Sequence, residues 1–282
     1  FKKELLTKNI KLSSANSINI GRLIPQVVYY VVSYLELVTT DKIKLGDKVN
    51  FVVPTGNFGN ILAGYYAEQI GLPVNKLICA SNNNNVLYDF LKTGVYDKNR
   101  DFLKTVSPSM DILISSNLER LLYYVSGCDN AYVASLMKDL KETGRFEVTK
   151  EILNRIQEKF QTGFADDLDT KQTIKKIYEK DSYLLDTHTA VAYKVLLDNL
   201  DKEHVNVVLS TASPYKFTES VYTSLNEATN EDEFTLMNKL YEQTKVAIPE
   251  NLKDLDKKEI RHKDVINKNE MKKYILEKLG DL

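Results

Sequence analysis

The sequence is poor in the residues that build disulfide scaffolds and metal centres. Its 282 residues include two cysteines, three histidines and no tryptophan. Two thiols in a chain of this length argue against a disulfide-stapled fold and indicate a reducing compartment, so we predict a cytoplasmic protein. The histidines, His188, His204 and His262, lie far apart and near no pair of cysteines. They offer no local zinc-ligand spacing, and we predict no metal site.

The sequence also lacks an excess of one charge and a long apolar run. Its 38 Lys and Arg residues are balanced by 39 Asp and Glu residues, which gives a formal net charge of −1. This balance provides no global attraction to nucleic acid or to an anionic membrane. The most apolar segment, residues 23–38, contains Pro25 and Glu36 and is too short to span a bilayer. We therefore expect no nucleic-acid partner and no membrane partner.

Strand-like and helix-like segments alternate along most of the chain. Apolar runs at residues 49–53, 76–81 and 205–214 predict buried strands, with amphipathic helices between them. This alternation predicts an α/β fold with a parallel sheet flanked by helices. Residues 129–182 differ, because they show helical periodicity and no convincing strand. We predict an all-helical insertion there, within a larger α/β domain formed by residues 1–128 and 183–282.

A loop rich in glycine and asparagine follows the first predicted strand. The sequence PTGNFGN occupies residues 54–60, ahead of a helix expected over residues 60–70. Its glycine spacing is not that of a dinucleotide site, and residues 77–83 hold no acidic side chain to bind a ribose. A Walker A loop requires Gly-Lys-Ser/Thr, whereas Gly59 is followed by Asn60 and Ile61. The two familiar nucleotide sites are therefore excluded.

The same loop nevertheless has the chemistry of a phosphate site. Gly56 and Gly59 permit backbone conformations in which successive N–H groups converge on one anion. Asn60 is placed to cap the following helix, whose N-terminus favours negative charge. Thr55 and Asn57 add short side-chain donors. The alternative interpretation is a strand-to-helix turn that uses its glycines for geometry alone.

Three further clusters carry polar side chains beside predicted elements. The segment SSANSINIGRLIPQ, residues 13–26, opens a helix with small polar residues followed by Arg22. Such a helix start can hold a carboxylate or phosphate, although a helix cap is the simpler interpretation. The segment THTAVAYKVL begins a helix at Thr187 or His188, and LSTASPYKF ends a strand in hydroxyl groups. Ligands of α/β sheets bind at such strand ends, yet each of these residues is also common in ordinary turns and caps.

Taken in order, the four segments resemble threonine synthase, an enzyme that uses pyridoxal 5′-phosphate (PLP) and has the type II fold of PLP enzymes. The resemblance extends over about residues 10–225 and is most specific in PTGNFGN and TASPYKF. It implies that the Gly/Asn loop holds the cofactor phosphate, with the following residues in contact or adjacent: Thr55, Gly56, Asn57, Phe58, Gly59 and Asn60. It also implies that Thr211 lies at the pyridine nitrogen, where a neutral hydroxyl moderates the electron sink.

The resemblance implies a lyase of threonine biosynthesis. Its reaction converts O-phospho-L-homoserine and water to L-threonine and phosphate. This substrate carries a carboxylate and a phosphate, so it needs anion sites in addition to that of the cofactor. The candidates for binding it are Asn16, Ser17, Asn19 and Arg22.

The Schiff-base lysine of such an enzyme is not found in this sequence. In the family it lies far upstream in a Phe-Lys-Asp context, and FKKE at residues 1–4 is too close to the following helix to replace it. Thr187 also stands where a proline is expected. The chain begins at Phe1 within an amphipathic pattern. We therefore expect a C-terminal portion of the enzyme, monomeric or homodimeric, with no catalytic residue of its own.

Two alternatives stay open at this point. One is another PLP-dependent eliminase, such as a threonine or serine dehydratase-like enzyme. The other is a non-catalytic homologue that binds a phosphate ligand or acts as an interaction module.

Overall fold

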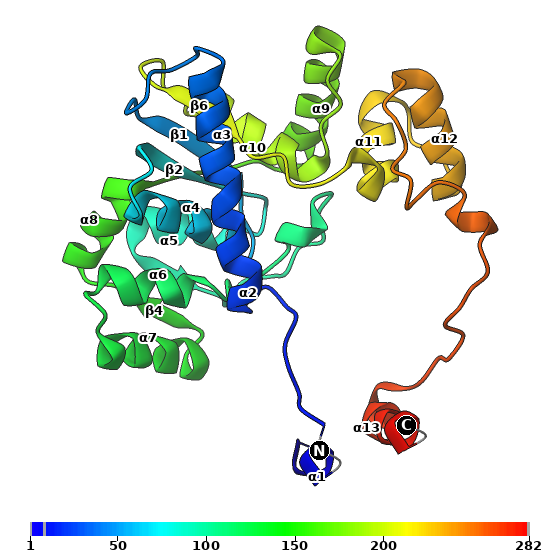
Figure 1. Cartoon of the computed structure of the whole chain (residues 1–282), viewed down its shortest axis with the longest axis horizontal. Helices are drawn as coiled ribbons and strands as arrows, with labels where there is room; N and C mark the ends of the chain where they lie inside the picture. Colours follow the sequence, from blue (N-terminus) through cyan, green and yellow to red (C-terminus); the bar gives the residue numbers. More distant parts are fainter. Residues whose placement is uncertain (1, 8–9, 281–282) are drawn as a thin grey trace. The chain divides into compact units, whose positions relative to one another are not determined.

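The computed structural model describes residues 2–7 and 10–280, and the chain divides into two units. The larger unit, residues 15–247, is built around a four-stranded sheet (Figure 1). The smaller unit combines residues 1–14 with residues 248–282. All the residues predicted for the functional site lie in the larger unit.

The secondary structure of the described residues is predominantly helical. The strands are β1 (Val49–Pro54), β2 (Val74–Ser81), β3 (Val95–Asp97), β4 (Arg145–Glu147), β5 (Phe160–Phe164) and β6 (Val205–Val208). The helices are α1 (Lys2–Thr7), α2 (Ile20–Leu23), α3 (Val27–Thr39), α4 (Gly59–Gln69), α5 (Val86–Thr93), α6 (Leu118–Val125), α7 (Asn130–Glu142), α8 (Lys150–Lys159), α9 (Asp167–Asp181), α10 (Thr187–Asp198), α11 (Thr218–Leu225), α12 (Glu233–Thr244) and α13 (Met271–Gly280). Short 3₁₀ turns occupy Ile24–Gln26, Pro108–Met110, Pro214–Phe217, Leu255–Lys257 and Lys268–Glu270.

The main sheet has the strand order β5-β2-β1-β6, and every neighbouring pair is parallel. Val49 of β1 lies opposite Val74 of β2 on one side and Val205 of β6 on the other. Strands β3 and β4 form a separate antiparallel pair. The C-terminal ends of β1 and β6 therefore lie side by side at one edge of the main sheet.

Side chains of the central strand alternate between two apolar layers. Phe51 and Val53 of β1 belong to the core cluster that contains residues of α4, α5 and α6. Val52 points to the opposite face and packs with Val191 and Val195 of α10. Burying each such side chain stabilises the fold by roughly 1.5–3 kcal/mol. The prediction of a parallel sheet flanked by helices is confirmed.

The description of residues 129–182 as all-helical is wrong, because they contain β4 and β5. Strand β5 joins the main sheet beside β2, and Phe160 at its start is buried. A Cβ atom at Gly163 would lie 2.7 Å from Val195 Cγ1, so this glycine lets α10 pack closely on the strand. The short sequence FQTGF follows an amphipathic helix directly, and its mixed polarity gives no clear strand period. The assignment of these residues to a separate insertion stays a prediction.

The helix expected to open within residues 13–26 is interrupted. Asn19 caps the short helix α2 by accepting the Gly21 N–H at 2.8 Å, and a 3₁₀ turn containing Pro25 separates α2 from α3. Proline has no backbone N–H to donate to the preceding turn, which explains the interruption. Helix α3 then begins at Val27.

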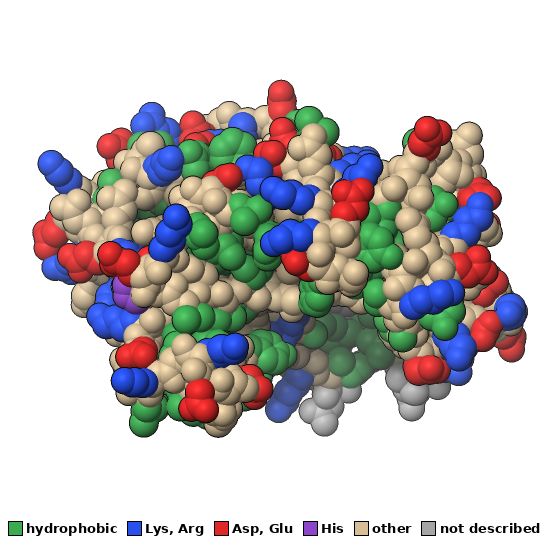
Figure 2. Space-filling model, turned by 90° about the horizontal axis from the view of Figure 1, so that it is seen from above, with side chains coloured by type: hydrophobic (Ala, Val, Ile, Leu, Met, Phe, Trp, Pro, Cys, Tyr) green, Lys and Arg blue, Asp and Glu red, His purple; other side chains and the backbone are tan. Residues whose placement is uncertain are grey.

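The surface shows mixed charge, in keeping with the net charge of −1. On the face that Figure 2 shows, Lys and Arg side chains are interspersed with Asp and Glu side chains. Among the described residues, no helix has the length and apolar character needed to cross a bilayer. The same residues contain no group of three or more His, Cys, Asp or Glu side chains arranged to hold a metal ion.

Candidate functional site

The candidate site lies where β1 and β6 end. The loop at residues 55–58 follows β1, and residues 209–211 follow the adjacent strand β6. Helix α4 leaves β1 on one face of the sheet, whereas α10 precedes β6 on the opposite face. The helices connected to these two adjacent strands therefore lie on opposite faces of the sheet. Parallel α/β sheets bind ligands at the strand ends where this happens.

The loop after β1 presents backbone donors. Phe58 has a left-handed backbone (φ 59°, ψ 10°), and its ring is buried with its centroid 5.7 Å from that of Phe160. This conformation turns the chain into α4, which begins at Gly59. Within the described part of the chain, the N–H groups of Gly56, Asn57 and Phe58 find no acceptor. These donors, with the N-terminus of α4, form a site suited to an anion.

The carbonyl groups of the same loop are bonded to another segment. Ser115 Oγ donates to Gly56 O at 2.9 Å, and the backbone N–H of Asn117 donates to Asn57 O at 3.1 Å. The Asn117 side-chain amide reinforces the second contact at 2.8 Å. With their carbonyls held in this way, the loop residues have N–H groups available for a ligand. This donor set fits a phosphate group.

Gly56 is required by the close approach of a neighbouring loop. A Cβ atom at this position would lie 2.9 Å from Ser109 O and 3.2 Å from Met110 Cα. A Cβ atom at Gly59 would make only an ordinary contact, 3.4 Å from Asn117 Nδ2. The first glycine of the loop therefore allows close packing, while the second lies at the first position of a helix.

The structure changes how three loop residues are understood. The prediction that Asn60 caps α4 is wrong, because Asn60 lies inside the helix and its Oδ1 accepts the Tyr30 hydroxyl at 2.7 Å. Thr55 donates its hydroxyl to Val53 O at 2.7 Å and its N–H to Ala80 O. The ring of Phe58 is in the core, so only its backbone can contact a ligand. Cofactor contacts at all three residues stay predictions.

Two adjoining cavities bring the predicted residues together. A cavity of about 190 Å³ lies at the loop and is also lined by Ser17, Arg22 and Ser109. A cavity of about 650 Å³ lies between the start of α3 and the end of β6, and Thr211 lines it. Arg22, Gln26 and Asn60 line both cavities. The fold thus places the loop after β1, Arg22 and Thr211 around two adjoining cavities.

The four predicted substrate residues divide into two pairs. Ser17 lines the smaller cavity, and Arg22 lines both. Asn16 and Asn19 instead serve the local backbone, since their side-chain oxygens accept the N–H groups of Ile18 and Gly21. Arg22 donates from Nη1 to Ala15 O at 2.9 Å, and its other guanidinium N–H groups can bind an anion. Substrate binding by all four residues stays a prediction.

Asn117 was not identified from the sequence. Its partners Ser17 and Asn57 lie 100 and 60 positions away, so no local pattern reveals them. The only hint is the run of small polar residues, SSN at residues 115–117, ahead of a helix. Its side chain is fully buried.

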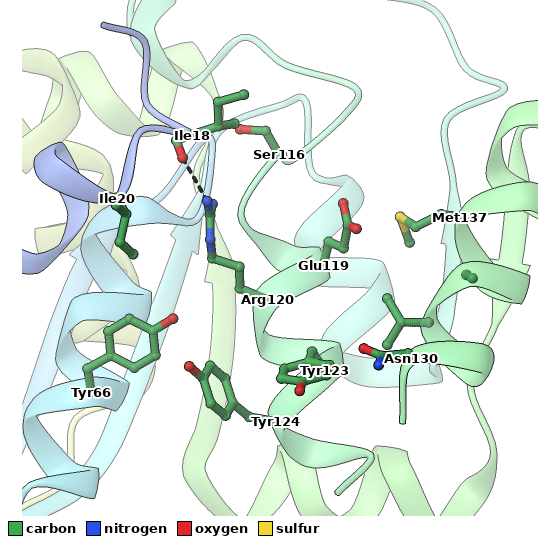
Figure 3. A pocket seen from close by; sticks show the side chains of 12 residues that line it. Ile18, Ile20, Tyr66, Ser116, Glu119, Arg120, Tyr123, Tyr124, Asn130 and Met137 are labelled. Atoms are coloured by element: carbon green, nitrogen blue, oxygen red, sulfur yellow. Dashed lines mark hydrogen bonds between the residues drawn. The ribbon is translucent and has the colours of Figure 1, made fainter. Parts of the chain in front are cut away.

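A third cavity, of about 510 Å³, lies beside the segment that leads into α2 (Figure 3). Arg120 of α6 reaches across it and donates from Nη2 to Ile18 O at 2.7 Å. Tyr66 and Tyr124 face each other along its wall, and burial raises the pKa of Tyr66. None of the predicted cofactor residues lines this cavity. The hydrogen bond from Arg120 to Ile18 O holds the segment that carries Ser17 and Arg22.

Comparison with known proteins gives a consistent result. A family model described as "Threonine synthase, C-terminal" matches residues 189–275. The chain is 38% identical to threonine synthase of Saccharomyces cerevisiae over 270 residues, which cover 90% of this chain and 50% of the yeast protein. It is 44% identical over 216 residues to human "Threonine synthase-like 1", covering 76% of this chain and 29% of the human protein.

Solved structures agree with the sequence comparisons. The crystal structure of yeast threonine synthase superposes with a TM-score of 0.80 at 36% identity, covering 97% of this chain and 55% of the yeast chain. PLP-bound threonine synthase from Brucella melitensis gives a TM-score of 0.74 at 40% identity, covering 84% of this chain and 51% of that one. The chain therefore spans about half the length of these enzymes.

Proposed function

The chain is a homologue of the threonine synthases, and we propose that it forms the phosphate-binding and ring-binding part of a PLP site in such an enzyme. The observation that carries this proposal is the polarity of the loop after β1. Its carbonyl groups are bonded to Ser115 and Asn117, while the N–H groups of Gly56, Asn57 and Phe58 have no protein acceptor among the described residues. Thr211 lines the adjoining cavity, as a residue at the pyridine nitrogen must.

The reaction proposed for the complete protein is the conversion of O-phospho-L-homoserine and water to L-threonine and phosphate. Bound PLP supplies an electron sink for the reacting amino acid. Residues of this chain would bind and orient the cofactor: the N–H groups of the loop would hold its phosphate, and the Thr211 hydroxyl would meet the ring nitrogen without keeping it protonated. Arg22 borders both cavities and supplies a fork of donors suited to a carboxylate or phosphate of the substrate.

We also propose that this chain is a portion of the enzyme that lacks the covalent lysine. The chain spans half of the yeast relative. In addition, a row of large apolar side chains, Ile24, Val28, Val32 and Leu35, is about half exposed along the outer side of the α3 region. An apolar row of this kind is typical of a surface that another part of the protein covers. We propose that the remainder of the enzyme packs there.

A borohydride experiment tests the absence of the lysine. The purified chain is mixed with PLP, reduced with borohydride and analysed by peptide mass spectrometry. We expect no single lysine to be fixed stoichiometrically. Stoichiometric fixation to one lysine, with a matching absorbance band, contradicts the proposal.

Assays of the full-length protein separate the alternatives. Phosphate release from O-phospho-L-homoserine supports a threonine synthase, whereas ammonia release from threonine or serine supports a dehydratase-like enzyme. If neither phosphate nor ammonia is released and phosphate binding is retained, the result supports a non-catalytic homologue. A cytoplasmic location and a monomeric or homodimeric state are part of the same proposal.

A further inference from the structure

A buried carboxylate, Asp186, lies at the start of α10 and organises the residues around it. Its Oδ1 accepts the N–H groups of His188 at 2.8 Å and Thr189 at 3.2 Å, which caps the helix. The Thr189 hydroxyl donates to Oδ2 of the same carboxylate. Asp186, His188 and Thr189 are each at most 3% exposed. The cluster is therefore shielded from water.

The charge state of Asp186 follows from these contacts. Burial by itself raises the pKa of a carboxyl group, but the hydrogen bonds from His188 and Thr189 outweigh it and hold the pKa of Asp186 below its usual range. At neutral pH the group is an anion with fixed donors. It can therefore orient the two side chains that follow it.

The first of these side chains reaches the phosphate end of the proposed site. His188 Nδ1 lies 3.4 Å from Asp186 Oδ1, and His188 Nε2 accepts the backbone N–H of Ser109 at 3.0 Å. An acceptor at Nε2 requires the proton to reside on Nδ1, toward the carboxylate. Ser109 lines the small cavity, and its carbonyl oxygen is the atom that a Cβ at Gly56 would meet.

The second side chain reaches the ring end of the same site. Thr189 Oγ1 accepts the backbone N–H of Thr211 at 3.4 Å and lies 3.4 Å from Ser210 Oγ. Ser210 and Thr211 follow β6 and line the larger cavity. Both contacts are long, so each is weak by itself.

We propose that Asp186, His188 and Thr189 are positioning residues that fix the distance between the phosphate end and the ring end of the PLP site. A helix cap needs only the carboxylate of Asp186. The His188 ring and the Thr189 hydroxyl extend from the helix to segments 79 and 22 positions away. A short arm joins the phosphate of PLP to its planar ring and limits how far apart the two ends can lie, so a site that binds both ends gains from a fixed separation. This inference rests on the proposed function.

The test uses two ligands that sample different ends of the site. Inorganic phosphate occupies the phosphate end alone, whereas PLP occupies both ends. In calorimetric titration of the chain, His188→Leu should weaken the binding of both ligands roughly three- to tenfold, which is the effect of one lost hydrogen bond. His188→Gln, which keeps an acceptor for the Ser109 N–H, should restore most of the affinity. Thr189→Val should weaken the binding of PLP and leave the binding of inorganic phosphate unchanged.

The matched control is His204→Leu, because His204 pairs with Asp201 at the opposite end of β6 and lines neither cavity. It should bind both ligands like the unmodified chain. Nitrogen NMR of the unmodified chain adds a measurement that needs no variant, and it should find the His188 proton on Nδ1. A proton on Nε2 overturns the proposal.

The remaining outcomes separate this inference from the proposed function. If the unmodified chain binds neither phosphate nor PLP, the proposed function fails and the positioning role fails with it. If it binds both and His188→Leu binds them equally well, the positioning role alone fails. The positioning role also fails if Thr189→Val weakens phosphate binding as much as PLP binding, since that result indicates a general loss of structure.

Discussion

The side-chain amide of Asn117 donates to the carbonyl oxygen of Asn57 at 2.8 Å, across 60 positions of sequence. The same amide nitrogen donates to Ser17 O at 3.1 Å. A single buried side chain thus joins the loop after β1, the segment before α2 and the start of α6. Because it holds the carbonyl side of the loop, Asn117 determines which way the loop N–H groups face.

Replacing this side chain should therefore affect both stability and binding. Asn117→Leu keeps a similar side-chain volume but removes the amide donor. The Ser17 carbonyl then loses its bond from residue 117, and the Asn57 carbonyl keeps only the bond from the backbone N–H of that residue. We expect a loss of roughly 1–3 kcal/mol in the free energy of unfolding and weaker binding of PLP. Urea unfolding and calorimetric titration measure the two effects. The exposed Asn99→Ala serves as control and should change the free energy of unfolding by less than about 0.5 kcal/mol.

The two glycines of the loop should differ in their tolerance of alanine. Gly56→Ala places a methyl group 2.9 Å from the Ser109 carbonyl oxygen, which forces two backbone segments apart. Roughly 1–3 kcal/mol of stability should be lost. Gly59→Ala meets only an ordinary contact and should change stability by less than about 0.5 kcal/mol. If the two variants lose equal stability in thermal unfolding, the contact between residue 56 and the Ser109 backbone does not restrict the side chain at position 56.

The depressed pKa of Asp186 predicts an acid-sensitive contribution to stability. A carboxyl group whose pKa is lowered by folding stabilises the folded state at pH values above its unfolded pKa of about 3.9. That contribution is lost as the pH falls through the folded value. Asp186→Asn should thus be less stable than the unmodified chain by roughly 1–3 kcal/mol at pH 7, with a smaller difference at pH 2. A difference that stays constant over this range speaks against an ionised Asp186 in the fold.

The two cysteines should react very differently. Burial in β2 raises the pKa of the Cys79 thiol to about 12, whereas Cys128 is exposed. The thiolate is the reactive form, so a thiol reagent at pH 8 should label Cys128 alone in the native chain. Both residues should be labelled in denaturant. Labelling of native Cys79, followed by mass spectrometry, would indicate that the main sheet opens readily.

The fold was predictable where the sequence pattern is local. Buried strands and the helices between them follow from apolar runs and periodicity, and β1, β2 and α4 lie close to their predicted bounds. Strand β5 was missed because its sequence, FQTGF, has polar residues and a glycine between two phenylalanines and continues directly from an amphipathic helix. Its membership of the sheet is determined by pairing with β2, which is a contact between distant segments.

The site was predictable only in part, for the same reason. The glycines and hydroxyl groups at strand ends are visible in the sequence, and the fold places Gly56, Arg22 and Thr211 around adjoining cavities. The residues that orient them are not visible, because Asn117 and His188 act through backbone groups 60 and 79 positions away. The apparent cap Asn60 was misassigned, since Phe58 begins the turn and Tyr30 holds the Asn60 side chain.

The central claim is that the loop after β1 and the residues after β6 together bind PLP. Titration of the isotopically labelled chain with PLP, followed by backbone amide NMR, tests it most directly. We predict saturable shifts that are largest at the amides of Gly56, Asn57 and Phe58, with a second set at Thr211. An unlabelled inorganic phosphate titration should reproduce the first set without the second. Saturable binding that shifts neither set, or no saturable binding at all, contradicts the claim.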